Sequence, residues 1–256
     1  MADIVAVGHE LTDALRRYHA DYIELRLEES QSSHIVYRGR ELESIDRATA
    51  IGGNVRALVK GGWGFVSFND FGELPGRIEL AVKQAQFVGH EKSQLAEVAP
   101  VVDKVLAGVS QNPVTMPLAE KKQLLDEYND IIWRTPRIQT STIHYGDGRK
   151  RVVFLNSAGT FVEQERMDIT IRLTAVAAKD GDVQQAGLSL GSRGDFNRVK
   201  GLHQPIAEMA QRAVELLSAQ QVKGGEYTVV LDPVLAGVFA HVAFGHLSES
   251  DFLYEN

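Results

Sequence analysis

The sequence contains no cysteine in its 256 residues. A chain without thiols forms no disulfide and offers no thiolate as a nucleophile or metal ligand. It also lacks a run of about 18 apolar residues, the length that a membrane helix needs. The N-terminal segment carries acidic residues, among them Asp3 and Glu10, and has no basic start followed by an apolar core, so no signal peptide is expected. These absences favour a cytoplasmic protein without a membrane anchor.

Basic residues are also in the minority. Lys and Arg number 27 against 34 Asp and Glu, which gives a net charge of −7. No segment collects basic and aromatic residues, so direct binding to nucleic acid is not expected. Proline is scarce, with 7 residues, whereas the 23 glycines are typical of many turns between strands. The remaining composition, 44% hydrophobic and 24% charged, is that of a globular protein.

Residues 1–90 predict a first α+β unit. Apolar residues recur at helical spacing over residues 4–19 and again in an amphipathic segment at 74–89. Between them, the stretch YIELRLEES alternates polar and apolar residues, and two similar stretches follow after glycine-containing links. Because these links are too short for crossover helices, the strands are predicted to be mostly antiparallel.

A second α+β unit is predicted at residues 117–222, after a linker at 91–116 that loses periodicity and contains prolines. It begins with a clear helix at 118–135 and ends with another at 203–220. The strands between them, over 138–190, are separated by the stretches GDG, NSAG and KDGD, which we expect to form hairpin turns. The order of elements echoes that of the first unit, which favours an architectural duplication.

Residues 223–256 predict the start of a third domain. The stretch EYTVVLD at 226–232 is typical of a strand, and Asp232 followed by Pro233 is typical of a helix start. About 30 residues are too few to bury a core of their own. The expected fold class is therefore α+β, with two helix/antiparallel-sheet units and the start of a truncated third domain.

Two histidines, His241 and His246, lie in this last segment, five residues apart. On a regular helix, side chains at this spacing point about 140° away from each other. Metal-binding pairs of the HExxH type use a four-residue offset instead. A π-bulge, or unwinding at Gly245, would absorb the extra residue. From spacing alone the pair is either structural, as a buried helix histidine and a C-terminal capping histidine, or a metal-binding pair.

The stretch LDPVLAGVFAHVAFGHLSESDFLYEN resembles the motif segment of the TldD/PmbA family, known as modulators of DNA gyrase and as TldD-type zinc metallopeptidases. The family's catalytic members carry HExxxH, followed by a Gly-His turn and a Glu-x-Asp pair. His241, His246 and Gly245 match the first part of this pattern, and Glu249 and Asp251 match the acidic pair. The stretches RGRELESID and NSAGTFVEQ also resemble the family, so the resemblance covers nearly the whole chain.

The resemblance implies that His241 and His246 are zinc ligands and that residues 223–256 begin a C-terminal metallopeptidase domain. The family's general-base glutamate is replaced by Val242, which can neither polarise a metal-bound water nor carry its proton. Glu249 or Asp251 could substitute. The family's further metal ligand, a cysteine of the C-terminal domain, is not in this sequence. Zinc is therefore expected for the full-length family member, and we expect weak or no zinc, and no hydrolysis, in this chain.

Three functions remain open at this point. The first is a TldD-like metallopeptidase subunit that acts on small or unfolded peptides as a homo- or heterodimer with a family member. Exposed strand edges would suit the capture of such peptides by β-augmentation. The second is a non-catalytic, PmbA-like partner, which Val242 favours. The third is a regulatory protein that binds gyrase or another DNA-linked partner.

Overall fold

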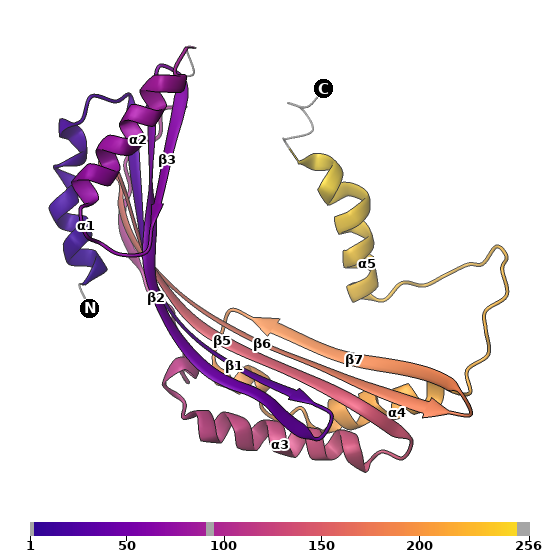
Figure 1. The fold of residues 1–256 in the computed structure, drawn as a ribbon. Helices are drawn as coiled ribbons and strands as arrows, with labels where there is room; N and C mark the ends of the chain where they lie inside the picture. The colour runs from indigo at the N-terminus through magenta and orange to yellow at the C-terminus, as the bar shows by residue number, and fades with distance from the viewer. Residues whose placement is uncertain (1–2, 91–94, 250–256) are drawn as a thin grey trace. The chain divides into compact units, whose positions relative to one another are not determined.

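The structure is a computed structural model that describes residues 3–90 and 95–249 (Figure 1). The chain divides into two compact units, Met1–Ser218 and Ala219–Asn256. The helices of the first unit are α1 (Ile4–Thr12), α2 (Leu74–Val88), α3 (Leu118–Arg134) and α4 (His203–Leu216). Its strands are β1 (Tyr22–Arg38), β2 (Glu41–Val59), β3 (Gly62–Phe68), β4 (Val102–Val105), β5 (Ile138–Asn156), β6 (Phe161–Lys179) and β7 (Asp182–Ser192). Short 3₁₀ turns lie at Leu15–Arg17, Pro113–Thr115 and Phe196–Val199.

All seven strands belong to one sheet, in the order β3-β2-β1-β5-β6-β4, with β7 also paired to β6. The pairings are antiparallel except for that of β4 with β6. β1 pairs with β2 on one side and with β5 on the other, where the register runs from Glu24 opposite Asn156 to Arg38 opposite Thr142. The strands of the two expected units are therefore continuous with each other. The predicted α+β class with an antiparallel sheet is confirmed.

One of the three predicted turns is wrong. The glycines of GDG, Gly146 and Gly148, lie in the middle of β5, opposite His34 and Ser32 of β1. The neighbouring strands β1 and β6 satisfy the backbone hydrogen bonds there, so tertiary pairing overrides the local tendency to form a turn. The other two stretches do connect hairpins. At the second of them, Asp180 and Gly181 have φ of 50° and 88°, the pattern of a type I′ turn.

Two separate apolar clusters lie against this one sheet. Figure 1 shows α1 and α2 at one end of the long strands and α3 and α4 at the other end. The first cluster joins α1 and α2 to β1, β2 and β5, and the second joins α3 and α4 to β1, β5, β6 and β7. Both apolar clusters include residues of β1 and β5, so no break in the sheet separates them. The domain boundaries expected at 90 and 117 therefore remain predictions.

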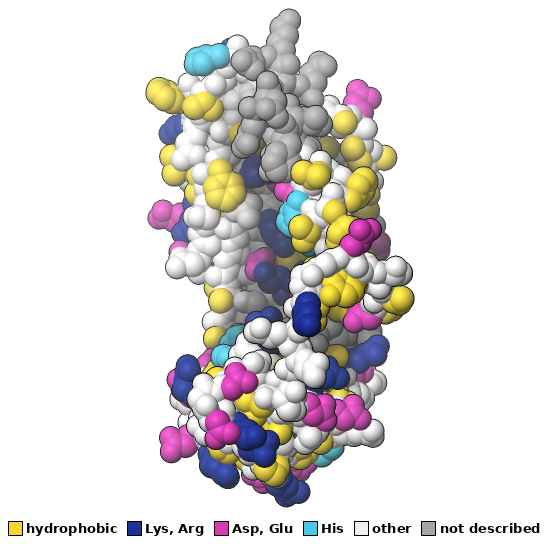
Figure 2. All heavy atoms as spheres, turned by 90° about the vertical axis from the view of Figure 1, so that its right-hand side faces the viewer, with side chains coloured by type: hydrophobic (Ala, Val, Ile, Leu, Met, Phe, Trp, Pro, Cys, Tyr) yellow, Lys and Arg dark blue, Asp and Glu magenta, His cyan; other side chains and the backbone are white. Residues whose placement is uncertain are grey.

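Charged side chains occupy the sheet between the two clusters, and most of them are paired with each other. Arg151 and Lys104 both contact the carboxylate of Glu163, at 2.7 and 2.9 Å. Arg149 pairs with Glu165 one step along the same strands. On the molecular surface, Figure 2 shows acidic and basic side chains interspersed over the face that it presents.

The second unit contains a single helical stretch among its described residues. It begins as the α-helix α5 (Pro233–Ala240), continues as a π-helical turn (His241–Gly245) and ends as a 3₁₀ turn (His246–Ser248). The Asp232 side chain accepts a hydrogen bond from the Leu235 N–H at 2.8 Å, which confirms the predicted helix start. The strand predicted at 226–232 is wrong, since no partner strand pairs with these residues in the described chain.

No side chain in the described part of the second unit is buried. The exposed apolar residues of its helical stretch are Val234, Leu235, Val238, Phe239, Val242, Phe244 and Leu247. Within residues 3–90 and 95–249, none of the helices has the length and apolar character needed to cross a membrane.

Candidate functional site

The π-helical turn decides how the two histidines lie. The N–H of His246 donates to the carbonyl oxygen of His241, five residues earlier, instead of the usual four. This wider turn absorbs the extra residue, so that the two rings lie on the same side of the helix. Their centroids are 4.5 Å apart and their planes are inclined by 57°. The opposed arrangement that a regular helix would give is therefore absent here.

Gly245 lies within the same turn, next to the ring of His241. A Cβ at this position would lie 3.4 Å from Nδ1 of His241. Glycine thus leaves space beside the imidazole as well as backbone freedom in the turn. Both histidines are exposed, which makes the alternative of a buried helix histidine wrong. The side chain of His246 is 53% exposed.

Glu249 contacts the histidine pair from the residue just after the helical stretch. Its Oε1 lies 3.2 Å from Nδ1 of His246. A carboxylate at Nδ1 holds the ring proton there and leaves the lone pair of Nε2 free for another ligand. Asp251, the other half of the acidic pair expected from sequence, lies outside the described residues.

Val242, where the resemblance places a general base, is part of the π-helical turn and is 57% exposed. Its isopropyl group has neither a proton to give nor a lone pair to accept one. Val242 therefore cannot transfer a proton, although the π-helical turn brings the two imidazole rings together.

The donor set fits a metal in part. Across residues 3–90 and 95–249, no group of three or more His, Asp or Glu side chains has the arrangement of a metal site. Two imidazoles are common zinc ligands, but a catalytic zinc takes three protein ligands and a water. Two histidines are one protein ligand fewer than such a set requires, and the Glu249 carboxylate contacts one of them.

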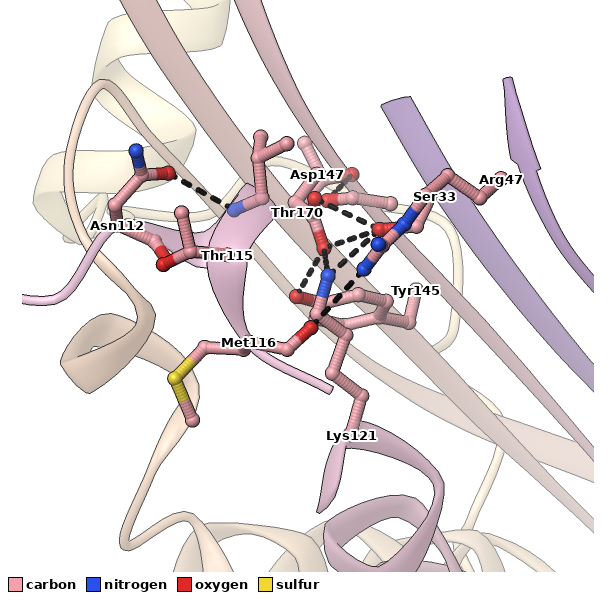
Figure 3. Close-up of polar contacts among 11 residues, drawn as sticks. Ser33, Arg47, Asn112, Thr115, Met116, Lys121, Tyr145, Asp147 and Thr170 are labelled. Carbon is pink, nitrogen blue, oxygen red and sulfur yellow. Dashed lines mark hydrogen bonds and ion pairs between the residues drawn. The ribbon is translucent and has the colours of Figure 1, made fainter. Parts of the chain in front are cut away.

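A second polar cluster, which sequence reasoning missed, lies in the first unit (Figure 3). The Lys121 ammonium donates to Oγ of Ser33 at 2.7 Å and to the Asp147 carboxylate at 2.5 Å. The hydroxyls of Ser33 and Tyr145 donate to the same carboxylate, at 2.8 and 2.6 Å. A serine beside a lysine is also the arrangement of a nucleophilic dyad. Here Ser33 and Lys121 are each only 1% exposed, so no substrate can reach them.

Burial controls the electrostatics of this cluster. It lowers the pKa of Lys121, against the opposing influence of the hydrogen bond and charge of Asp147. Burial, together with the neighbouring Asp147, also raises the pKa of the Tyr145 hydroxyl far above its ordinary value. A nearby guanidinium, that of Arg47, donates to the carbonyl oxygen of Met116 at 3.1 Å and so holds the segment before α3 against β2. The cluster therefore fastens α3 to the sheet.

A sequence signal for Lys121 did exist. It lies four, seven and eleven residues before Leu125, Tyr128 and Ile132, which are all buried. A lysine on the apolar face of an amphipathic helix needs a buried partner.

Two family models match the chain and together cover most of it. The PmbA/TldA metallopeptidase domain 1 matches residues 23–86, and the PmbA/TldA metallopeptidase central domain matches residues 111–221. The chain belongs to the TldD/PmbA family. The resemblance drawn from the motif segment is thereby confirmed by segments that lie outside that motif.

Relatives within the TldD/PmbA family are named as metalloproteases. The chain is 40% identical over 259 residues to the metalloprotease slr0863 of Synechocystis, covering 99% of this chain and 56% of that protein. It is 24% identical to a zinc metalloprotease TldD homolog of Saccharolobus solfataricus, covering 78% of this chain and 44% of the relative. The chain thus spans about half the length of the curated relatives it matches.

Solved structures support the fold of this TldD/PmbA chain. A putative modulator of DNA gyrase from Bacteroides thetaiotaomicron superposes with a TM-score of 0.73 at 18% identity, covering 95% of this chain and 56% of that one. TldE from Thermococcus kodakarensis superposes with a TM-score of 0.65 at 14% identity, covering 81% and 47%. At these identities the likeness establishes the fold alone.

Proposed function

We propose that this chain is part of a TldD-like zinc metallopeptidase subunit, in which His241 and His246 supply two metal ligands. The observation that carries the proposal is the π-helical turn, which brings the two rings to a centroid distance of 4.5 Å. π-helical turns of this kind are frequent at functional sites. The names of the relatives, metalloproteases of about twice this length, support the same reading.

When bound, zinc would act as a Lewis acid that polarises a peptide carbonyl and lowers the pKa of a water. The chain's own contribution is to hold the imidazoles. Glu249 keeps the proton of His246 on Nδ1, at 3.2 Å, and so is a positioning residue for Nε2. A third ligand would come from the part of the family's length that this chain does not cover.

Val242 makes the chain, as it stands, a binding rather than a hydrolysing subunit. With valine beside the first histidine, no side chain at this position accepts the proton of a water. This favours the second candidate, a non-catalytic, PmbA-like partner that still holds a metal. Regulatory binding is the third candidate, because two of the similar solved structures are putative modulators of DNA gyrase.

The proposed substrates are small or unfolded peptides, and the proposed partner is a second family member in a homo- or heterodimer. The sheet edge at β7 suits peptide capture better than the edge at β3. At β3, Oε1 of Gln84 accepts the N–H of Phe65 at 3.1 Å, which caps that edge. β7 pairs only with β6 within the described residues, so its outer edge suits β-augmentation.

The test expresses the complete gene with Val242 and with Val242→Glu, and measures bound zinc and peptide hydrolysis for both. We expect zinc in both forms and cleavage only by the glutamate form. Cleavage by the valine form at a comparable rate would contradict the account of the missing base. If neither form binds zinc, and His241→Ala changes nothing, the histidines are not metal ligands.

A further inference from the structure

A hollow of about 620 Å³ lies on the sheet face that points away from α3 and α4. Side chains alternate along a strand, so the neighbours of the buried Ile35, Ile143 and Ile171 project to this other face. In this way β1, β5 and β6 each contribute one nitrogen-bearing side chain to the lining: His34, His144 and Arg172. The lining extends onto β7 as far as Gly191. Four strands from distant parts of the chain therefore build the hollow.

The register of the sheet brings the three nitrogen-bearing side chains together. His144 is the direct cross-strand partner of Arg172, and His34 is the partner of Gly146, two residues from His144. Direct partners in an antiparallel pair have Cβ atoms roughly 4.5–5.5 Å apart, and diagonal neighbours roughly 7–8 Å. All three side chains are exposed. Two imidazoles and a guanidinium thus meet at one place, with no hydrogen bond or ion pair to another residue that the structure describes.

The stretch GDG, whose glycines lie inside β5, supplies the floor of the hollow. Asp147 between them points to the opposite face, into the cluster with Lys121. Neither Gly146 nor Gly148 has a positive φ, so the backbone conformation does not require glycine there. Glycine weakens the interior of a strand, and where it occurs it often marks a place that a ligand or another backbone approaches closely.

The space above these glycines is open, in contrast to the space at other strand glycines. A Cβ at Gly64 would lie 1.9 Å from a carbonyl oxygen of α2, so packing on the helix requires glycine there. A Cβ at Gly146 would meet only side-chain atoms, Nδ1 of His34 and Oγ1 of Thr170, both at 3.3 Å. A Cβ at Gly191 would have its nearest neighbour at 3.7 Å. No backbone of the described chain therefore accounts for the glycines at 146 and 191.

Hydrogen-bond donors border the space above Gly146. An imidazole offers an N–H from one ring nitrogen when neutral and from both when protonated. The Thr170 hydroxyl, at the same place, makes a long hydrogen bond of 3.4 Å to the Gly146 carbonyl oxygen. The Arg172 guanidinium carries five N–H donors in a planar fork, which matches the two oxygens of a carboxylate. The lining therefore favours a ligand that accepts hydrogen bonds.

The acidic side chains near the hollow limit the charge of that ligand. Asp168 lines the hollow, but its carboxylate is paired with Arg166 at 2.7 Å. Asp46 of β2 is the cross-strand partner of His34 and is not part of the lining. Arg172 is thus the one permanent positive charge of the lining without an opposite charge among the described residues. It matches a monoanion, whereas a dianion would bring a second negative charge close to Asp46 and Asp168.

We propose that this hollow binds a carboxylate group, with Arg172 as its counter-ion and His34 and His144 as further donors. The volume of about 620 Å³ lies within the range of roughly 300–1,000 Å³ that is usual for small-ligand sites. Two carriers offer the same group: a free peptide, or an acidic side chain from the part of the family's length that this chain does not span. The proposal does not rest on the metal chemistry above, because none of its residues belongs to the second unit.

The test titrates two N-acetylated alanine dipeptides into the protein expressed from the complete gene and into the 256-residue chain. One dipeptide ends in a carboxylate and the other in an amide, so they differ in the anion alone. Isothermal titration calorimetry at low ionic strength measures binding. We expect saturable binding of the acid and none of the amide. Binding of the acid to both proteins assigns the hollow to a free ligand, and binding to the 256-residue chain alone assigns it to a carboxylate of the complete protein.

Arg172→Gln should weaken binding of the acid by about 10-fold or more, because a charge-assisted pair with the carboxylate is lost. Arg38→Gln is the matched control, since Arg38 lies on the same sheet face, pairs with Glu43 at 3.0 Å and does not line the hollow. If a carboxylate of the complete protein fills the hollow, Arg172→Gln should also lower the Tm of that protein more than Arg38→Gln does.

Three results would overturn the assignment. The first is equal binding of the amide, and the second is tighter binding of inorganic phosphate than of the acid. The third is equal behaviour of Arg172→Gln and Arg38→Gln in both affinity and Tm, which would leave net charge as the only cause.

Gly146→Ala tests the open space without removing a charge. Its methyl group should weaken binding of the acid several-fold, because it fills the floor between His34 and Thr170. Gly187→Ala is the control, since Gly187 lies within β7 outside the hollow, and its Cβ would meet a backbone oxygen at 3.3 Å. Equal weakening by the two variants would mean that strand stability, not the space, controls binding. His241→Ala should remove zinc and leave the titration unchanged, so the two proposals fail separately.

Discussion

The two units of the chain differ in whether their apolar side chains are buried. In Met1–Ser218, all four helices bury apolar side chains against the sheet, and the charges beneath them are paired. In Ala219–Asn256, every described side chain lies at or near the surface, although α5 is almost wholly apolar. The first unit is therefore held by tertiary contacts. The geometry that places the histidines in the second unit is held by hydrogen bonds between residues close in sequence.

The largest loss of stability is expected for Lys121→Ala in the first unit. It leaves the Asp147 carboxylate buried without its partner, which should cost about 3–5 kcal/mol of the free energy of unfolding. Chemical denaturation followed by circular dichroism measures the loss. The matched control is Lys122→Ala, whose pair with Asp126 is exposed and worth about 0.3–0.5 kcal/mol. Equal losses for the two variants would show that burial does not set the importance of the pair.

A pair of identical truncations compares the units directly. Leu125→Ala removes a side chain that is 1% exposed in α3 and should cost about 2–5 kcal/mol. Leu235→Ala removes the same atoms from α5, where they are already half exposed, and should change stability by about 0.5 kcal/mol or less. Thermal and urea denaturation of both variants give the difference. A large cost for Leu235→Ala would reveal packing of the second unit in solution.

Zinc affinity tests the same comparison in the second unit. In the protein expressed from the complete gene, Glu249→Ala should weaken zinc binding by about 10–100-fold, because Nδ1 of His246 loses its orienting carboxylate. Competition with a chelating dye measures the affinity, and the stability of the first unit should not change. Glu226→Ala removes an exposed acid of the same unit and serves as the control. Equal weakening by both variants would mean that only net charge near the histidines matters.

The smallest expected effect is on the stability of the folded protein at low pH. Burial alone would raise the pKa of Glu163, but the hydrogen bonds and charges of Lys104 and Arg151 hold it below the ordinary 4.5. A carboxyl group whose pKa is lower in the folded state stabilises the protein above its unfolded pKa. That contribution is lost as the pH falls below about 4.5 and through the folded pKa. Glu163→Gln should flatten the acid limb of the unfolding curve, whereas Asp182→Asn, at the exposed start of β7, should leave it unchanged.

The elements that sequence predicted well have strong periodicity of their own. The helices expected at 74–89 and 118–135 match α2 and α3 within a residue or two. The possibility of a π-turn between His241 and His246 also followed from local spacing and from Gly245. The strand expected at 226–232 failed because β propensity alone does not make a strand without a partner.

Local sequence thus specified where the helices begin, which faces are apolar and that a wider turn could absorb the extra residue between the histidines, because these depend on hydrogen bonds and side chains a few residues apart. It could not specify that β1 pairs with β5, a strand that begins about a hundred residues further along the chain. Nor could it show that the pairing would draw Gly146 into a strand and bring Asp147 beneath Lys121. Such contacts depend on which distant segments bury each other's surfaces, and that free energy exists only once the sheet is assembled.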